Sequence, residues 1–113
     1  MKRYRLSPEA GADLDGIWEY VAKRSSIETA TEFVERFLEL FAFLGAAPLA
    51  GRSVPKLGPP GTRRFPLATY LVYYKPGRNR IVIWRIIHGS RRQSAALRSV
   101  HTTKLRGHRR PFS

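Results

Sequence analysis

The 113-residue sequence predicts an α+β domain, in which a short N-terminal strand and an α-helical hairpin precede a small antiparallel sheet in the order β-α-α-β-β-β. Two observations support this prediction. As far as residue 44, apolar side chains recur at steps of three and four, which is the period of an α-helix. Beyond residue 62 they fall in short runs rich in β-branched and aromatic residues, which is typical of strands. A chain of this length forms one small domain.

Two helices are expected before the middle of the chain. Residues Ser7–Glu9 supply an N-cap, a proline at the first helical position and an acid in the first turn, and this helix should end near Lys23 and Arg24. The spacing of Ser25–Glu28 is that of a capping box, so a second helix should begin there and end at Gly45. Because only a few residues separate the two helices, they should pack as an antiparallel hairpin.

The remaining elements are strands and one long loop. Residues 45–61 contain four glycines and four prolines, so they are expected to form a loop. Pro66 indicates that the strand after this loop lies at an edge of the sheet or is bulged. The expected strands are Tyr4–Leu6, Arg63–Leu67, Tyr70–Lys75 and Ile81–His88.

Charge is divided unevenly along the chain. All eight acidic residues lie between Glu9 and Glu39, where solvated helix faces account for them, and residues 1–39 have a net charge of −2. Residues 40–113 carry fifteen Lys and Arg and no acid, which brings the formal net charge to +13. A cationic segment of this kind predicts an anionic partner, such as nucleic acid, an acidic protein segment or an anionic membrane surface.

The composition also excludes several kinds of chemistry. Cysteine is absent, which rules out disulfides, thiolate catalysis and cysteine-based metal sites. No catalytic triad, paired-carboxylate site or metal-ligand spacing occurs, so neither a metal nor another cofactor is expected. No apolar run approaches the ~20 residues that span a bilayer, and the N-terminus has no apolar signal core. We therefore expect a cytoplasmic protein.

The strand expected at Ile81–His88 is the most informative segment of the chain. It is apolar on both faces apart from Arg85, and it ends in His88 and Gly89, where the glycine permits a sharp turn. One helical hairpin covers only one face of a small sheet, so the second apolar face needs another cover. Two alternatives for this cover stay open. One is an acid-rich partner segment that folds on binding, and the other is a short helix around residues 95–100 of the C-terminal tail.

Several short motifs, taken in order, are similar to a known family. They are Leu6–Ala10 followed by Asp13-Leu14 and Ile17–Tyr20, then Pro48–Arg52, Arg64–Pro66, Tyr70–Tyr74 and Arg85–Arg91. Each motif is a weak signal alone, but the set resembles the ParE branch of the RelE/ParE toxin superfamily over roughly residues 3–92. We therefore assign residues 1–92 to a RelE/ParE-like domain and residues 93–113 to a basic C-terminal extension outside the resemblance.

The resemblance implies the toxin of a type II toxin–antitoxin pair. A cognate ParD-like antitoxin, with an acidic and flexible C-terminal segment, would neutralise it. For the ParE branch the implied target is DNA gyrase, inhibited by protein–protein contact so that replication is blocked. Contact with DNA would be indirect, through the antitoxin complex, and no membrane is involved. Two alternatives stay open: a RelE-like, metal-independent mRNA endoribonuclease that acts on the ribosome, and an inactive member that only binds its antitoxin.

The expected site residues lie mostly in the later strands. RNA cleavage needs groups that take up and release protons and cations that hold a phosphate, and an endoribonuclease would draw these from Arg64, Arg85 and His88. The RelE branch implies lysines and arginines on the sheet and a tyrosine or histidine near the C-terminus, so the lack of any tyrosine after Tyr74 speaks against that activity. His88 is more simply a hydrogen-bonded residue that closes its strand. The residues expected to bind a partner are Arg52, Arg63, Arg64, Trp84, Arg85, His88, Arg91 and Arg92.

Overall fold

Five strands and two helices follow one another along residues 2–90, the part of the chain that this computed structural model describes. Their bounds are β1 Tyr4–Leu6, α1 Pro8–Arg24, α2 Ile27–Ala46, β2 Arg52–Ser53, β3 Arg63–Leu67, β4 Tyr70–Pro76 and β5 Ile81–His88. The predicted α+β class and the predicted order of the longer elements are confirmed. Sequence reasoning missed β2, a two-residue strand inside the expected loop that pairs with β3.

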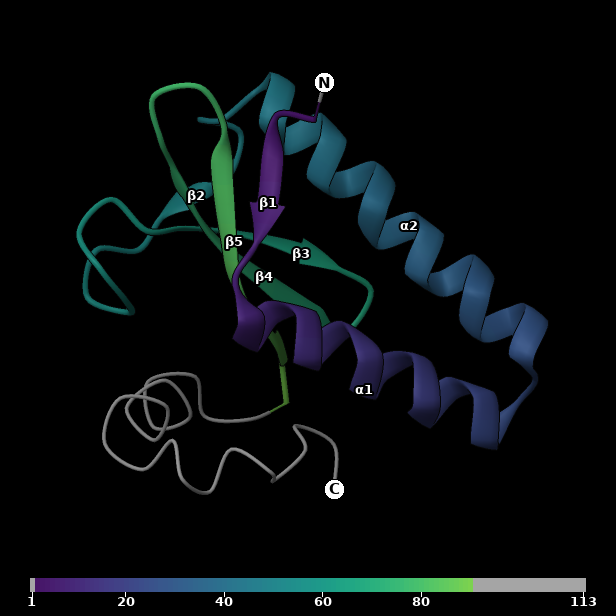
Figure 1. Ribbon diagram of the computed structural model, residues 1–113. Coiled ribbons are helices and arrows are strands. Elements are labelled where there is room, and N and C mark those ends of the chain that lie inside the picture. The colour runs from purple at the N-terminus through teal and green to yellow at the C-terminus, as the bar shows by residue number, and fades with distance from the viewer. Residues whose placement is uncertain (1, 91–113) are drawn as a thin grey trace.

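The strands form one mixed sheet in the order β1-β5-β4-β3-β2. β1 lies parallel to β5, whereas the other neighbouring pairs are antiparallel. The predicted small antiparallel sheet is therefore confirmed, and the N-terminal strand adds one parallel pair at its edge. Parallel neighbours cannot be joined by a tight turn, and here the connection between β1 and β4–β5 includes the whole helical hairpin. The first and last strands therefore lie side by side (Figure 1).

The helices α1 and α2 form the predicted hairpin and cover one side of the sheet, which is called here the helix face (Figure 1). Ile17 of α1 and Phe37 and Phe41 of α2 are fully buried there, in one cluster with Val72 of β4 and Ile83 of β5. The buried positions of both helices follow the three-and-four spacing of the sequence. This cluster is the main core of the domain.

The helix ends differ in two details from the sequence expectation. Ser7 and Ser26 are the N-caps of α1 and α2, and each side chain accepts the backbone N–H of the third residue onward at 3.0 Å. The second helix thus begins one residue later than the capping-box spacing suggested, because Ser25 is the C-cap of α1. It also continues through Gly45. A Cβ there would lie 2.9 Å from the Cβ of Arg3, so this glycine permits close packing rather than ending the helix.

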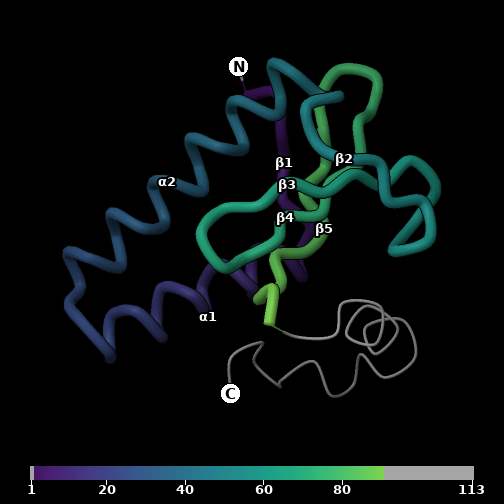
Figure 2. The backbone as a smooth tube through the Cα atoms, turned by 180° about the vertical axis from the view of Figure 1, so that it is seen from behind, coloured from purple at the N-terminus to yellow at the C-terminus, as the bar shows by residue number. Residues whose placement is uncertain are grey.

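The other side of the sheet, called here the open face, has a small apolar cluster of its own. The cluster consists of Val54, Leu57, Leu71, Tyr73, Trp84 and Ile87. Val54 and Leu57 belong to the loop after β2, so this loop covers part of the face that was expected to need a partner segment or the tail. Figures 1 and 2 both show the loop on the side of the sheet away from the helices. The short helix expected around residues 95–100 lies outside the described residues.

Candidate interaction surface around strand β5

Strand β5 contains a β-bulge at Trp84. Its register with β4 shifts between Tyr73, which pairs with Arg85, and Tyr74, which pairs with Ile83, so Trp84 is an extra residue in the ladder. Before the bulge the odd-numbered residues of β5 face the helices, and after it the even-numbered residues do. Because a bulge re-aims the side chains that follow it, β5 can place residues in both apolar clusters.

Residues at the start of α1 complete the edge of β5 beyond the end of β1. Ser7 donates its backbone N–H to the carbonyl of Ile83 at 2.8 Å and its hydroxyl to the carbonyl of Trp84 at 3.0 Å. The Oδ2 atom of Asp13 accepts the backbone N–H of Ile86 at 2.9 Å. These contacts replace those of a neighbouring strand, so the backbone groups of the bulged segment are hydrogen-bonded although β1 has ended.

Asp13 also forms a bidentate ion pair with Arg85. The Nε and Nη2 atoms of Arg85 donate to Oδ2 and Oδ1 of Asp13 at 2.7 and 3.1 Å, and the two side chains are 13% and 9% exposed, respectively. Burial raises the pKa of the Asp13 carboxyl, and the Arg85 guanidinium and the Ile86 N–H offset part of this rise. Arg85 is thus engaged within the fold.

Asp13 is an exception to the expectation that the helix acids lie on solvated faces, and that expectation was wrong for this residue. Two signals in the sequence could have found it. Asp13 lies three residues after Ala10 and four before Ile17, on the apolar stripe of α1. Arg85 is the lone charge in an otherwise apolar strand, so it needed a partner within the fold.

Three of the residues expected to bind a partner gather on the open face. Arg64 lies opposite Tyr73 of β4 and opposite Arg52 of β2, so these side chains share one face. The Arg64 guanidinium hydrogen-bonds the Tyr73 hydroxyl, and the ring centroid of Tyr73 lies 6.1 Å from that of Trp84. Burial raises the pKa of Tyr73, and Arg64 offsets part of this rise. We call Arg52, Arg64, Tyr73 and Trp84 the open-face cluster.

His88 and Arg63 lie elsewhere. His88 packs edge-on against Tyr70 of the helix-face cluster, with ring centroids 5.1 Å apart. Its Nδ1 accepts the backbone N–H of Ser90 at 3.2 Å and lies 2.6 Å from the Ser90 hydroxyl, so local bonds hold the ring at the strand end. Neighbouring residues of a strand point to opposite faces of the sheet, so the Arg63 side chain lies on the other face from Arg64. Its Nε donates to the Gly51 carbonyl at 2.8 Å.

The three residues that an endoribonuclease would use are therefore not brought together. Arg64 is on the open face, His88 is on the helix face, and Arg85 is bound to Asp13. Arg91 and Arg92 lie outside the described residues. Sequence reasoning did not anticipate Ser7, Asp13 and Tyr73 as part of this region.

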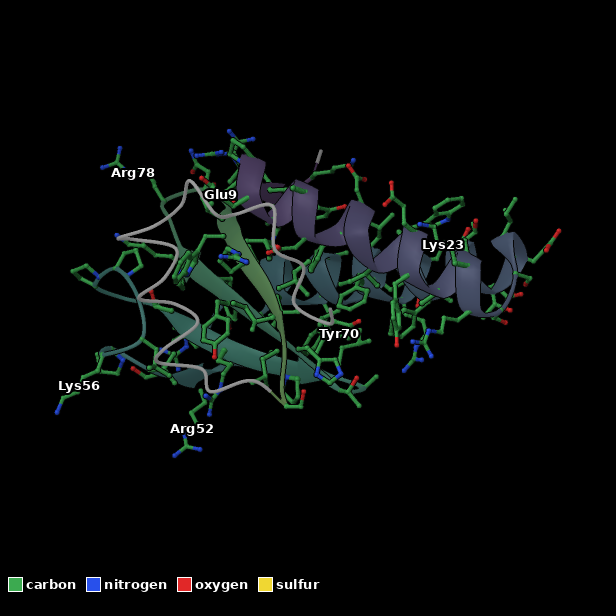
Figure 3. The ribbon with its side chains drawn as sticks, turned by 90° about the horizontal axis from the view of Figure 1, so that it is seen from below. Glu9, Lys23, Arg52, Lys56, Tyr70 and Arg78 are labelled. Carbon is green, nitrogen blue, oxygen red and sulfur yellow. The ribbon has the colours of Figure 1, made fainter. Side chains whose placement is uncertain are left out.

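The charge of the described part of the chain is also segregated in space. Residues 40–90 carry eight Lys and Arg and no acid. Figure 3 shows three of these cations, Arg52, Lys56 and Arg78, along one side of the molecule, far from Lys23 on α1.

Within residues 2–90 no cluster of three His, Asp or Glu side chains could hold a metal ion. No helix in the same range could span a membrane.

Comparison with known proteins identifies the family. The family model described as the ParE toxin of type II toxin–antitoxin systems, parDE, matches residues 4–93. Toxin ParE1 of Caulobacter vibrioides is 34% identical over 97 residues, covering 86% of this chain and 99% of that relative. Toxin ParE3 of the same organism is 31% identical over 93 residues, covering 82% and 91%.

The fold agrees with this assignment. A solved chain of the chromosomal ParDE toxin–antitoxin system from P. aeruginosa superposes with a TM-score of 0.66, at 24% identity and over 78% of this chain and 96% of that chain. The fold and the sequence matches together define a small toxin. The chain belongs to the ParE toxin family of type II toxin–antitoxin systems.

Proposed function

We propose that this chain inhibits DNA gyrase by protein–protein contact and so blocks replication, and that the open-face cluster is the surface that makes this contact. Family membership supports the general role of a toxin. We propose gyrase as the target because the sequence motifs are similar to the ParE branch, for which gyrase is the implied target. The proposal implies a cytoplasmic location, because that is where gyrase acts.

One observation supports contact over RNA cleavage. General acid–base cleavage needs its proton-transfer group within about 3 Å of the reacting atoms and a cation on the same phosphate. His88 and Arg64 lie on opposite faces of the sheet, and the guanidinium of Arg85 is occupied by Asp13. A non-catalytic inhibitor has no need for these three groups to converge.

The open-face cluster has the composition of a protein-binding surface. Tryptophan, tyrosine and arginine supply most of the energy at protein interfaces, because they offer large rigid contact areas together with directed hydrogen bonds. Here Tyr73 is fully buried beneath the surface and supports both Trp84 and Arg64. Arg52 is exposed beside them and would meet an acidic group on the target.

A cognate antitoxin is the second proposed partner. Exposed apolar residues in the last turns of α2 and just after it support this proposal. Phe43 and Leu49 are 49% and 70% exposed, and the ring of Phe43 lies 6.0 Å from that of Phe65. The guanidinium of Arg63 lies next to them and donates to the Leu49 carbonyl at 3.3 Å. An apolar segment with acidic side chains would cover this surface and pair with the arginine. Neutralisation would follow if the bound antitoxin keeps the toxin from gyrase.

The direct test of the target is a plasmid supercoiling and cleavage assay with purified gyrase and antitoxin-free protein. We expect supercoiling to fall and linear DNA to accumulate as the protein is added. In parallel, the protein is added to translating ribosomes and the mRNA is analysed for cuts. The proposal would be overturned in favour of an endoribonuclease if the protein does not inhibit gyrase but cuts mRNA, and if His88→Ala abolishes this cutting. Inactivity in both assays would indicate a member that only binds its antitoxin.

The antitoxin surface can be tested by calorimetric titration with the antitoxin. The double variant Phe43→Ala/Leu49→Ala should bind at least about tenfold more weakly, because it removes two exposed apolar contacts. The matched control is Ile27→Ala, which removes an exposed apolar side chain at the opposite end of α2 and should bind as tightly as the native chain. Equal losses in both variants would show that the antitoxin does not use the Phe43 surface.

A further inference from the structure

Six exposed cations lie at one end of the sheet, outside the proposed contact surfaces. They come from the N-terminal segment, the end of β4 and the β4–β5 turn, which lie at the same end of the molecule (Figure 1). The six residues are Lys2, Arg3, Arg5, Lys75, Arg78 and Arg80. We call them the hairpin-end cluster.

The sheet register fixes how these cations are arranged. Arg5 of β1 and Lys75 of β4 both lie opposite Val82 of β5, so the three side chains form one row on the open face. With strands about 4.8 Å apart, the two cationic residues of this row are about 10 Å from each other. The backbone around the row is held by bonds from Ile81 N–H to the Arg3 carbonyl and from Gly77 N–H to the Arg80 carbonyl, both 2.9 Å.

No carboxylate neutralises this cluster. All acidic residues of the chain lie between Glu9 and Glu39, and within residues 2–90 none of the six cations forms an ion pair. Like charges about 10 Å apart with no counter-ion between them still repel one another at low salt, so the arrangement lowers the stability of the free protein. Two of the six have a partial structural explanation. Lys2 lies over the ring of Tyr4 at 5.7 Å, and Arg3 packs beside Gly45 near the negative end of α2.

We propose that the hairpin-end cluster binds the phosphate backbone of duplex DNA directly. A duplex presents one negative charge per about 1.7 Å of its axis, and binding it requires only cations at suitable positions. An acidic peptide would also need apolar anchors, and the side chains among the cations offer few, since Gly77 and Asn79 are exposed and Val82 is half-buried. Cations spread over two strands, the N-terminal segment and a turn suit a surface with two rows of phosphates better than a single extended strand.

This contact would be made by the chain itself and not through an antitoxin, so it goes beyond the proposed function and does not depend on gyrase as the target. If gyrase is the target, the same contact would help to hold the protein near the DNA that gyrase carries. The hairpin-end cluster is separate from the open-face cluster, because Arg52 and Arg64 lie on β2 and β3, toward the edge of the sheet opposite β1.

The test is the salt dependence of binding to a short fluorescent DNA duplex, measured by anisotropy with the full chain between about 50 and 200 mM salt. The variant is Lys75→Gln/Arg78→Gln/Arg80→Gln. The control is Lys23→Gln/Arg24→Gln/Arg36→Gln, which removes the same charge from the two helices. Both variants keep the basic residues 91–113, so any binding by this segment affects them equally.

We expect the slope of log affinity against log salt to become shallower by about 0.9 for each lost phosphate contact, and by up to about 2.7 for the hairpin-end variant. At about 100 mM salt its affinity should fall at least about tenfold, whereas the helix control should change little. The melting temperature of the hairpin-end variant should rise, because repulsion has been removed. If the triple variant does not fold, Arg78→Gln alone, in the exposed turn, should still reduce the slope by about 0.9.

Three results would overturn the proposal. Equal losses in the two triple variants would show that only net charge matters. Tighter binding of a polyglutamate peptide than of the duplex, with the same dependence on the three residues, would identify an acidic protein as the partner. Equal or tighter binding of a single-stranded RNA would contradict the assignment to duplex DNA.

Discussion

The two faces of the sheet are both apolar, but they are covered in different ways. On the helix face, two long helices bury a large aromatic and aliphatic cluster around Phe37 and Phe41. On the open face, Val54 and Leu57 from one loop cover a cluster of a few residues, and cations such as Arg64 lie at its border. The helix face completes the fold, whereas the open face carries the aromatic and cationic groups that we propose as the contact surface. Stability and function are therefore expected to respond to mutations on different faces.

The largest effect should come from removing a side chain of the helix-face core. Phe37→Ala should lower the free energy of unfolding by about 3–5 kcal/mol, because Phe37 is fully buried and packs edge-on against Phe33 and Tyr70. Leu57→Ala on the open face should cost only about 1–2 kcal/mol, since Leu57 is a loop residue whose side chain is only half-buried against the small apolar cluster of that face. Urea unfolding of both variants checks the contrast, and equal losses would contradict the division between the two faces.

The next largest effect concerns the ion pair that joins α1 to the bulged end of β5. Asp13→Ala should destabilise the protein by about 3 kcal/mol, because it leaves Arg85 largely buried without its carboxylate and the Ile86 N–H without an acceptor. Asp13→Asn keeps an acceptor oxygen and should cost less. Urea unfolding at pH 7 measures both. A negligible effect of Asp13→Ala would mean that α1 does not hold the β5 edge.

A smaller effect should follow from lifting the loop off the open face. A Cβ at Gly58 would clash with the Trp84 ring, so Gly58→Ala must shift either the loop or the ring. We expect a loss of about 1–3 kcal/mol and a red shift of Trp84 emission as the ring becomes more exposed. A Trp18→Phe background leaves Trp84 as the only tryptophan and isolates its signal. Unchanged emission would contradict the assignment of the loop as the cover.

The smallest effect is a pH dependence at the same ion pair. Burial raises the pKa of Asp13 in the folded protein, so the folded state binds this proton more tightly than the unfolded state. The resulting stability is fully present below the unfolded pKa and is lost as the pH rises through the folded pKa. The stability of the native chain relative to Asp13→Asn should therefore fall from about pH 4 upward. A relative stability that rises with pH would show instead that the Arg85 charge dominates.

Much of the fold could be predicted from the sequence, because local signals and tertiary packing agree. Glycines, prolines and β-branched runs bound the strands β3 and β5 at their observed ends, and Ser7 begins α1 as expected. The parallel pairing of β1 with β5 and the bulge at Trp84 were not foreseen, because both depend on how α1 and β4 meet β5 in space. The same bulge turns His88 to the helix face and so separates it from Arg64, whereas Arg85 is engaged by Asp13.

The most direct test of the central claim compares two charge-matched double variants in the gyrase supercoiling assay. Arg52→Gln/Arg64→Gln removes two cations from the open-face cluster, and Lys23→Gln/Arg36→Gln removes two from the helices. The account predicts that the first variant stays folded and inhibits gyrase at least about tenfold less well, whereas the second inhibits like the native chain. Full inhibition by the first variant, or an equal loss in both, would contradict the open face as the surface that contacts gyrase.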